Sequence, residues 1–400
     1  MNKFIKICLL LTIMLVSACS EPSINTKDTI LQKQSPVSSP ENNFELMPKS
    51  DVMFSDDKAT LSSRENDKLN VPFKIRTYDL RRDTVEGVSV APEYVNEEII
   101  AFDTLDAKEE YSFVGTYNKK SKAYKKIYVA PKGRITNSLT GINKSLYWVE
   151  YDSDLNNELH WSIIAYNLSN ATKKTIKSGV TKNEIDPPIL GISNGNITWI
   201  EYDFPNKKVI SKVVSYSPTT GNEKVIATVE LDESNGRNGV FFSSMNAVDE
   251  GFIVHQSIFD KNNSTKKYRI SFYPNQNNTQ PLHLLEKNRV IDYTVGGNWF
   301  VWTEEGAVFI ASLKDGKVKY RFDGNSKKLT NDTPIIKENF LFYRYAINQI
   351  FVVDLNTGQR MPISANQTLT SKLYKSGRFI SFALDDDEKN KDVIKMYVLE

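Results

Sequence analysis

The stretch from Leu146 to Asp152 reads LYWVEYD, and the stretch from Ile197 to Asp203 reads ITWIEYD. Both runs are short and rich in aromatic and β-branched residues, and polar residues flank them, which is typical of β-strands. Weaker copies of the same run recur along the chain. The residues that align with Trp148 and Trp199 in these copies are Ala101, Val254, Trp302, Phe342 and Ser381.

The copies form a repeat. They are Ile99–Asp103, Leu146–Asp152, Ile197–Asp203, Phe252–Gln256, Phe300–Glu304, Phe340–Arg344 and Phe379–Ala383. The aligned positions are 47, 51, 55, 48, 40 and 39 residues apart, a period that fits four short strands per unit. This is the size of one blade of a β-propeller. We expect the aligned tryptophans to fill equivalent slots between blades, because large aromatic side chains dominate core burial.

The last unit is incomplete, since the chain stops at Glu400 after one further strand, Val393–Leu399. Phe73–Leu80 reads as a strand that precedes the first unit and has no partner within the repeat. The sequence therefore predicts an all-β fold with seven four-stranded blades. The ring would be closed by pairing of Phe73–Leu80 with Val393–Leu399.

This architecture resembles the bacterial TolB-like and WD40-like β-propellers over about residues 73 to 400. The resemblance rests on strand spacing, because the Trp-Ser-Pro-Asp-Gly signature of TolB-type repeats is absent and so are the Gly-His and Trp-Asp pairs of WD40 repeats. Several TolB-like propellers are exported or act at the cell envelope. The resemblance implies a fold and a compartment, and a fold alone implies no activity.

The N-terminus is typical of an export signal, with Lys3 and Lys6 before an apolar run from Ile7 to Leu15. That run is shorter than the ~20 residues of a membrane-spanning helix. Val16–Cys19 resembles the lipobox of bacterial lipoproteins, which implies cleavage before Cys19 and attachment of lipid, including palmitate, to its thiol. Residues 1–18 are then a lipoprotein signal peptide. The domain would be anchored on the extracytoplasmic face of a cell membrane.

An ordinary secreted protein cleaved after Ala18 is the alternative. Residues 19–70 are rich in Ser, Pro, Asn, Asp and Lys and predict a disordered polar tether before a domain at 71–400. Removal of the signal leaves lysine and arginine balanced by aspartate and glutamate, which argues against a nucleic-acid partner. It also removes Cys8, so the mature chain can form no internal disulfide.

Acidic residues stand two positions after the aligned residue in four units. They are Asp103, Glu150, Glu201 and Glu304. A ring of these side chains could bind a cation or a cationic ligand, or supply paired carboxylates for glycoside or lyase chemistry. Alternatively, repeated units repeat their internal hydrogen bonds, and each carboxylate is satisfied by a neighbouring blade.

Asp152, Asp154, Asn156 and Glu158 alternate oxygen ligands as a calcium loop does. The glycine that an EF-hand needs at its sixth position is replaced by Asn157. The stretch is therefore either a looser calcium site, in which Asp152 and Asp154 are the main candidates, or a solvated turn. No other cofactor and no catalytic residue is predicted.

These patterns favour a non-catalytic binding or assembly module on a lipid anchor, with an envelope protein or polymer as its partner. The alternative is a carboxylate-dependent hydrolase or lyase that acts on a polysaccharide in the central funnel. Convergence of two or more of Asp103, Glu150, Glu201 and Glu304 on that funnel would favour the enzyme. Burial of these carboxylates between blades would favour the binding module.

Overall fold

The computed structural model describes residues 54, 64–65, 69–85, 87, 90–106, 108, 110–152, 158–182, 185–234, 236–261, 265–274, 280–324, 329–364, 369–385 and 393–400. Strands make up most of this part of the chain, and a short helix, α2 (Arg82–Val85), follows the second strand. The described residues contain no helix with the length and apolar character needed to span a membrane. Cys19 and the predicted signal lie outside the described residues.

The strands form antiparallel sheets whose order follows the chain. The first two sheets contain β3 (Tyr94–Val95), β4 (Ile99–Leu105), β5 (Ser112–Asn118) and β6 (Tyr124–Val129), then β7 (Arg134–Ile142), β8 (Ser145–Asp152), β9 (Glu158–Asn167) and β10 (Thr172–Lys182). A third, eight-stranded sheet contains β11 (Gly191–Ser193), β12 (Asn196–Asp203), β13 (Lys208–Tyr216), β14 (Glu223–Asp232), β15 (Asn238–Val248), β16 (Gly251–Asp260), β17 (Thr265–Tyr273) and β18 (Leu282–Glu286). Strands β14 and β15 pair with each other only at their ends, so this sheet consists of two four-stranded halves.

Three more sheets complete the domain. One contains β19 (Asp292–Gly296), β20 (Trp299–Glu304), β21 (Ala307–Ser312) and β22 (Lys317–Asp323), and the next contains β23 (Asn331–Lys337), β24 (Phe340–Tyr345), β25 (Gln349–Asp354), β26 (Gln359–Pro362) and the short β1 (Arg64–Glu65). The last contains β27 (Leu369–Thr370), β28 (Tyr374–Ser376), β29 (Phe379–Asp385), β30 (Val393–Leu399) and β2 (Ile75–Arg81).

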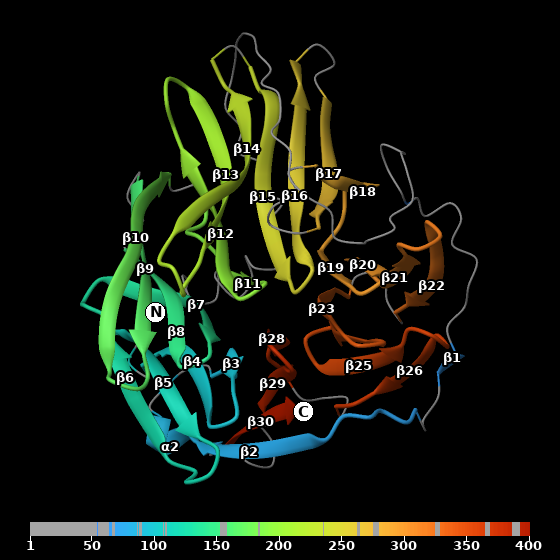
Figure 1. Cartoon of the computed structure of the whole chain (residues 1–400). Helices are drawn as coiled ribbons and strands as arrows, with labels where there is room; N and C mark the ends of the chain where they lie inside the picture. The colour runs from blue at the N-terminus through green and yellow to red at the C-terminus, as the bar shows by residue number, and fades with distance from the viewer. Residues whose placement is uncertain are drawn as a thin grey trace.

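The sheets stand around a common centre (Figure 1). Their innermost strands contact one another in succession, from β11 through β15, β19, β23, β28 and β3 to β7. Between β7 and β11, the Leu190 amide donates a hydrogen bond of 2.7 Å to Ser138 Oγ. The centre is therefore bordered by the first strand of each unit.

Each run found in the sequence is the second strand of its unit, for example β8 between β7 and β9. The innermost strands were missed by the sequence analysis. Several of them, such as β3, β11 and β28, are only two or three residues long, and the pairing of β7 with β8 is interrupted between Asn137 and Thr140. Strands this short or irregular show too little alternation of apolar and polar residues to be recognised in the sequence.

The aligned tryptophans fill slots between neighbouring sheets, as predicted. Trp148 packs in one apolar cluster with Ala101 and Val114 of the preceding sheet, and Trp199 packs with Val149 of its own preceding sheet. All three aligned tryptophans are fully buried. The repeat in the sequence is therefore a repeat of packing between sheets.

The predicted pairing of the two chain ends is present. Strand β2 runs antiparallel along β30, from Ile75 opposite Leu399 to Arg81 opposite Val393, at the outer edge of its sheet (Figure 1). Leu80 points into an apolar cluster that also contains Phe102 of the neighbouring sheet. The N-terminal strand therefore supplies the outer strand that the last unit lacks.

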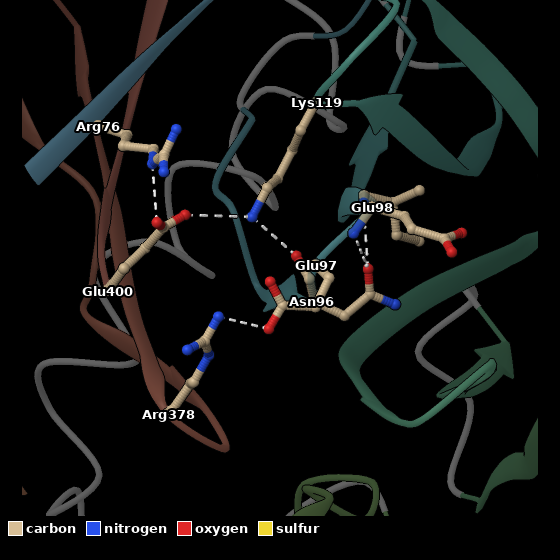
Figure 2. A network of polar contacts seen from close by, with 8 residues as sticks. Arg76, Asn96, Glu97, Glu98, Lys119, Arg378 and Glu400 are labelled. Atoms are coloured by element: carbon tan, nitrogen blue, oxygen red, sulfur yellow. Dashed lines mark hydrogen bonds and ion pairs between the residues drawn. The ribbon is translucent and has the colours of Figure 1, made fainter. Parts of the chain in front are cut away.

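The last residue joins the last sheet to the first (Figure 2). Glu400 accepts a hydrogen bond of 2.7 Å from Arg76 Nε, and its other carboxyl oxygen lies 3.4 Å from Lys119 Nζ. Lys119 also donates to the carbonyl of Asn96 at 2.9 Å. Burial raises the pKa of Glu400, but the hydrogen bond from Arg76 and the charge of Lys119 outweigh this effect and hold the pKa below its ordinary value.

A few residues of the predicted tether, residues 19–70, are described and lie against the sheets. Phe54 is only 3% exposed, donates its amide to Leu284 O at 3.0 Å and stacks on Phe300. Arg64 and Glu65 form the parallel pairing of β1 with β26, and Leu69 is buried. These residues are buried because their apolar side chains cover apolar positions on the sheets. The composition of the stretch does not reveal such contacts.

Replacement of Leu80 by alanine tests the contribution of β2. We expect Leu80→Ala to lower the free energy of unfolding by about 2 to 4 kcal/mol, since a buried leucine is lost and a cavity remains. Ile75→Ala is the matched control, because Ile75 lies on the same strand and is 41% exposed. Urea denaturation measures both; equal, small effects would show that β2 does not pack in solution.

Candidate functional site

The carboxylates of Glu201 and Glu304 link neighbouring sheets. Glu201 accepts a hydrogen bond from Trp199 Nε1 at 3.2 Å and lies 3.6 Å from Lys177 Nζ, which belongs to the preceding sheet. Glu304 repeats this arrangement with Trp302 Nε1 at 2.8 Å and Lys287 Nζ at 2.6 Å. In both places one carboxylate satisfies a buried indole and a neighbouring cation.

Glu150 is engaged in a similar way. It accepts a hydrogen bond from Tyr128 Oη of the preceding sheet and lies 3.1 Å from Arg134 Nε. Asp152 pairs with the same arginine at 3.2 Å and accepts the His160 amide at 3.3 Å. Asp154, the other predicted calcium ligand, lies outside the described residues. In the part of the chain that is described, no three His, Cys, Asp or Glu side chains gather in a way that could hold a metal ion.

Asp103 differs from the other three carboxylates. The carboxyl group of Glu93, in the loop before β3, acts on Asp103, whose Oδ2 atom is buried without a hydrogen-bond partner. Burial raises the pKa of Asp103, and burial together with the charge of Asp103 raises the pKa of Glu93 well above its ordinary value. Burial therefore favours the protonated form of these two carboxyl groups.

The Glu93–Asp103 pair belongs to a larger group at the centre. Burial raises the pKa of Tyr374, in the innermost strand β28, and the charges of Glu93, Asp103, Arg344 and Asp332 also act on it. Asp332 and Arg344 form a buried bidentate pair, with distances of 2.7 and 2.5 Å. We call these five residues the axial cluster. Glu93, Asp103 and Tyr374 keep partial exposure although protein surrounds them closely, as expected of groups that border a narrow central space.

The sequence analysis missed Glu93, although a signal existed. Acidic residues stand eight to ten positions upstream of the aligned residue in three units, at Glu93, Asp292 and Asp332. All three lie in or next to innermost strands, so they border the centre. Asp292 accepts the amides of Tyr293 and Thr333, both at 2.8 Å, and burial raises its pKa to about 6.

Next to the axial cluster, the turn between β24 and β25 has an unusual backbone. Ala346 and Ile347 both adopt positive φ, 52° and 56°, which is unfavourable for a β-branched residue. Neighbouring segments hold this turn, because the Ala346 amide donates to Thr330 O at 2.9 Å and the Thr370 amide donates to Ile347 O at 2.8 Å. Thr370 O in turn accepts a hydrogen bond of 2.9 Å from Arg344.

The turn presents an apolar surface. Ile347 is 45% exposed, and Leu329 and Leu369, next to the two threonines that hold the turn, are 38% and 50% exposed. We call Leu329, Ile347 and Leu369 the rim patch. Large exposed apolar side chains gathered in one place mark interaction surfaces more often than isolated ones do.

A surface cavity of about 500 Å³ adjoins the rim patch. It is lined by Arg289, Glu304, Glu305, Phe309, Arg321 and Asp323, among others. The Gly306 amide in its lining donates to Leu329 O at 2.9 Å. Glu304 is already paired with Lys287, and Arg321 with Asp323 at 2.8 Å, so ion pairs engage part of the charged lining of this cavity.

No protein-family model and no curated protein matches this chain in sequence. Solved structures do match. An acylaminoacyl peptidase in complex with Z-Gly-Gly-Phe-chloromethyl ketone has a TM-score of 0.50 and 10% identity, over 76% of this chain and 50% of that one. The fold is that of a β-propeller.

Two other propeller-sized matches have lower scores. The β-propeller domain of the Trilobed protease from Pyrococcus furiosus has a TM-score of 0.49 at 10% identity, over 78% of this chain and 93% of that one. The AfRom2 CNH domain has a TM-score of 0.43 at 11% identity, over 80% of this chain and 99% of that one. At these identities the likeness concerns the fold alone.

The raised pKa values predict the pH dependence of stability. An acid whose pKa is higher in the folded state retains its proton while the unfolded chain loses it. The pKa of aspartate is about 4 in the unfolded chain, and that of Asp103 is about 7 in the folded protein. The free energy of unfolding therefore falls as the pH rises from about 4 to about 7. We expect Asp103→Asn to make this slope shallower by roughly 1 kcal/mol per pH unit.

Urea denaturation of both proteins between pH 5 and pH 8 measures the slopes. His255 acts in the opposite direction, because burial lowers its pKa to about 4, and the difference between the two proteins removes its contribution. Glu93 and Tyr374, whose pKa values respond to the charge of Asp103, are the same in both proteins. The same pH dependence in both proteins would show that the pKa of Asp103 is not raised in the native protein.

Proposed function

We propose that this chain is a lipoprotein, held by a lipid on Cys19 at the extracytoplasmic face of a cell membrane. Its propeller would have seven four-stranded blades closed by β2 and would act as a non-catalytic binding or assembly module for an envelope protein or polymer. The signal-like N-terminus and its lipobox support the anchor. The succession of sheets and the pairing of β2 with β30 support the closed ring.

The rim patch is the observation that carries the binding role. A turn with two residues in the left-handed region costs of order 1 to 2 kcal/mol per residue, and glycine or asparagine would relieve that cost. Here Ala346 and Ile347 are held in place by hydrogen bonds from both sides, and the strained residue exposes an apolar side chain. Strain kept in this way is characteristic of functional surfaces.

The geometry gives the polysaccharide-active alternative little support. Glu150, Glu201 and Glu304 are engaged between sheets, which leaves Glu93 and Asp103 as the nearby carboxyl pair. The pKa values of both are raised, whereas a glycosidase needs one of its two carboxyl groups ionised. Binding without catalysis is therefore the better account of the centre.

Substitutions that suit positive φ test whether the turn at Ala346 and Ile347 is strained. We expect the double variant Ala346→Asn, Ile347→Gly to raise the free energy of unfolding by about 1 kcal/mol or more, since asparagine and glycine suit a turn with two positive φ values. Thermal or urea denaturation checks this. A loss of stability would contradict the strained conformation of the turn.

The same surface can be tested in cells. A photo-crosslinking residue at position 347 should capture a defined partner, and one at position 225 should not, because Val225 is equally exposed but lies on β14, away from the rim patch. Capture at both positions, or at neither, would contradict a role for the rim patch.

The anchor is tested separately. We expect Cys19→Ala to release the protein from the membrane fraction while position 347 still captures the same partner. Membrane retention of this variant would rule out a lipid on Cys19. Loss of the partner only in the released form would show that the membrane contributes to recognition.

A further inference from the structure

Lys337 is a buried lysine at the end of the innermost strand β23. The residue is 9% exposed, and its Nζ atom lies 4.4 Å from the centre of the Phe73 ring. Phe73 is itself buried and packs against Phe340 and Phe342, with 5.3 and 5.7 Å between the ring centres. The amino group of Lys337 therefore lies on an apolar, aromatic floor.

This amino group has no counter-ion. Among the residues that the structure describes, no carboxylate forms an ion pair with Lys337 and no group accepts a hydrogen bond from its Nζ atom. A buried charge without a partner is unfavourable, so the neutral amine gains relative to the ammonium. Nζ is not among the fully enclosed polar atoms, so it keeps contact with solvent.

Nearby charges act on the same amino group. Burial lowers the pKa of Lys337, and the positive charges of Arg378 and Lys375 lower it too, whereas the negative charges of Glu338 and Glu400 raise it. Arg378 and Glu400 belong to the network of contacts at the chain end (Figure 2). The net direction is downward, because burial has the largest effect.

We propose that Lys337 is a covalent binding site for an aldehyde, which it captures reversibly as an imine. A lysine amine that is removed from water and close to other cations is suited to such a reaction. Its lone pair attacks the carbonyl carbon, and a C–N bond forms. The carbonyl oxygen then leaves as water with the two amine protons, so the reaction needs no oxidant, reductant or other leaving group.

The surroundings of Lys337 favour this product. Loss of water from the first adduct is easier at a site that excludes most water. When the imine is protonated, its positive charge lies above the Phe73 ring, whose face attracts cations. The inference is independent of the rim patch and of the lipid anchor, because it rests on Lys337 and the groups around it.

Reductive labelling of the full chain with butanal and cyanoborohydride tests the site. Cyanoborohydride reduces the imine to a stable amine, and mass spectrometry of the digested protein gives the labelled fraction of each lysine. Lys144 is the matched control, because it is exposed in the turn between β7 and β8, which corresponds to the turn that follows Lys337. At pH 7 we expect Lys337 to be labelled about 10-fold faster or more, since the neutral fraction of an amine rises tenfold for each unit by which its pKa falls.

The pH dependence and two variants sharpen the test. At pH 10 the advantage of Lys337 over Lys144 should shrink to a few-fold, because much of every lysine is then neutral. Arg378→Gln should slow the labelling of Lys337 at pH 7 and leave it unchanged at pH 10, since it removes a positive charge that favours the neutral amine. Lys337→Arg keeps the positive charge and should lose the label that the wild type takes up first.

Two results would overturn the proposal. One is labelling of Lys337 at pH 7 that is no faster than that of Lys144. This comparison is made within the wild-type protein, so it decides even if Lys337→Arg fails to fold. The other is a preference for Lys337 that is equal at pH 7 and pH 10, because it would reflect access of the probe and not a readily formed neutral amine.

Discussion

Coverage of sheet faces is the constraint on which the rest of this structure depends. Each sheet is apolar on both faces, and only a neighbouring sheet can cover them. Trp148, Trp199 and Trp302 fill the slots thus created. Because the strands that bring these rings into place also carry Glu150, Glu201 and Glu304, the carboxylates lie where water is scarce. A cation compensates each of them, from the neighbouring sheet for Glu201 and Glu304 and from the same sheet for Glu150.

The same constraint explains what could be predicted from the sequence. The second strand of each unit, buried on both faces, carries the aromatic and β-branched run that repeats, and the unpaired Phe73–Leu80 pointed to its partner Val393–Leu399. Several innermost strands, such as β3, β11 and β28, are too short to leave a pattern. Glu93 lay outside any motif, and its charge acts on Tyr374, which is distant in sequence. Burial of Phe54 depends on an apolar slot that only the assembled sheets create.

The axial cluster and the rim patch are positioned by one side chain. Arg344 donates to Asp332, which borders the centre, and to Thr370, whose amide holds the strained turn at Ile347. A bidentate arginine is rigid enough to fix both partners. The two surfaces are therefore parts of one connected structure, although one is charged and inward-facing and the other is apolar and exposed.

The path of the N-terminal segment gives the domain a graded resistance to force. Phe54 contacts β18, β1 lies along β26 and β2 lies along β30, so the segment is attached at three successive points. A pull from the N-terminal side would load Phe54 first, then the two residues of β1, and only then the seven paired residues of β2. The weaker attachments would give way first and lengthen the connection. The fold is thus protected by contacts whose loss leaves the sheets intact.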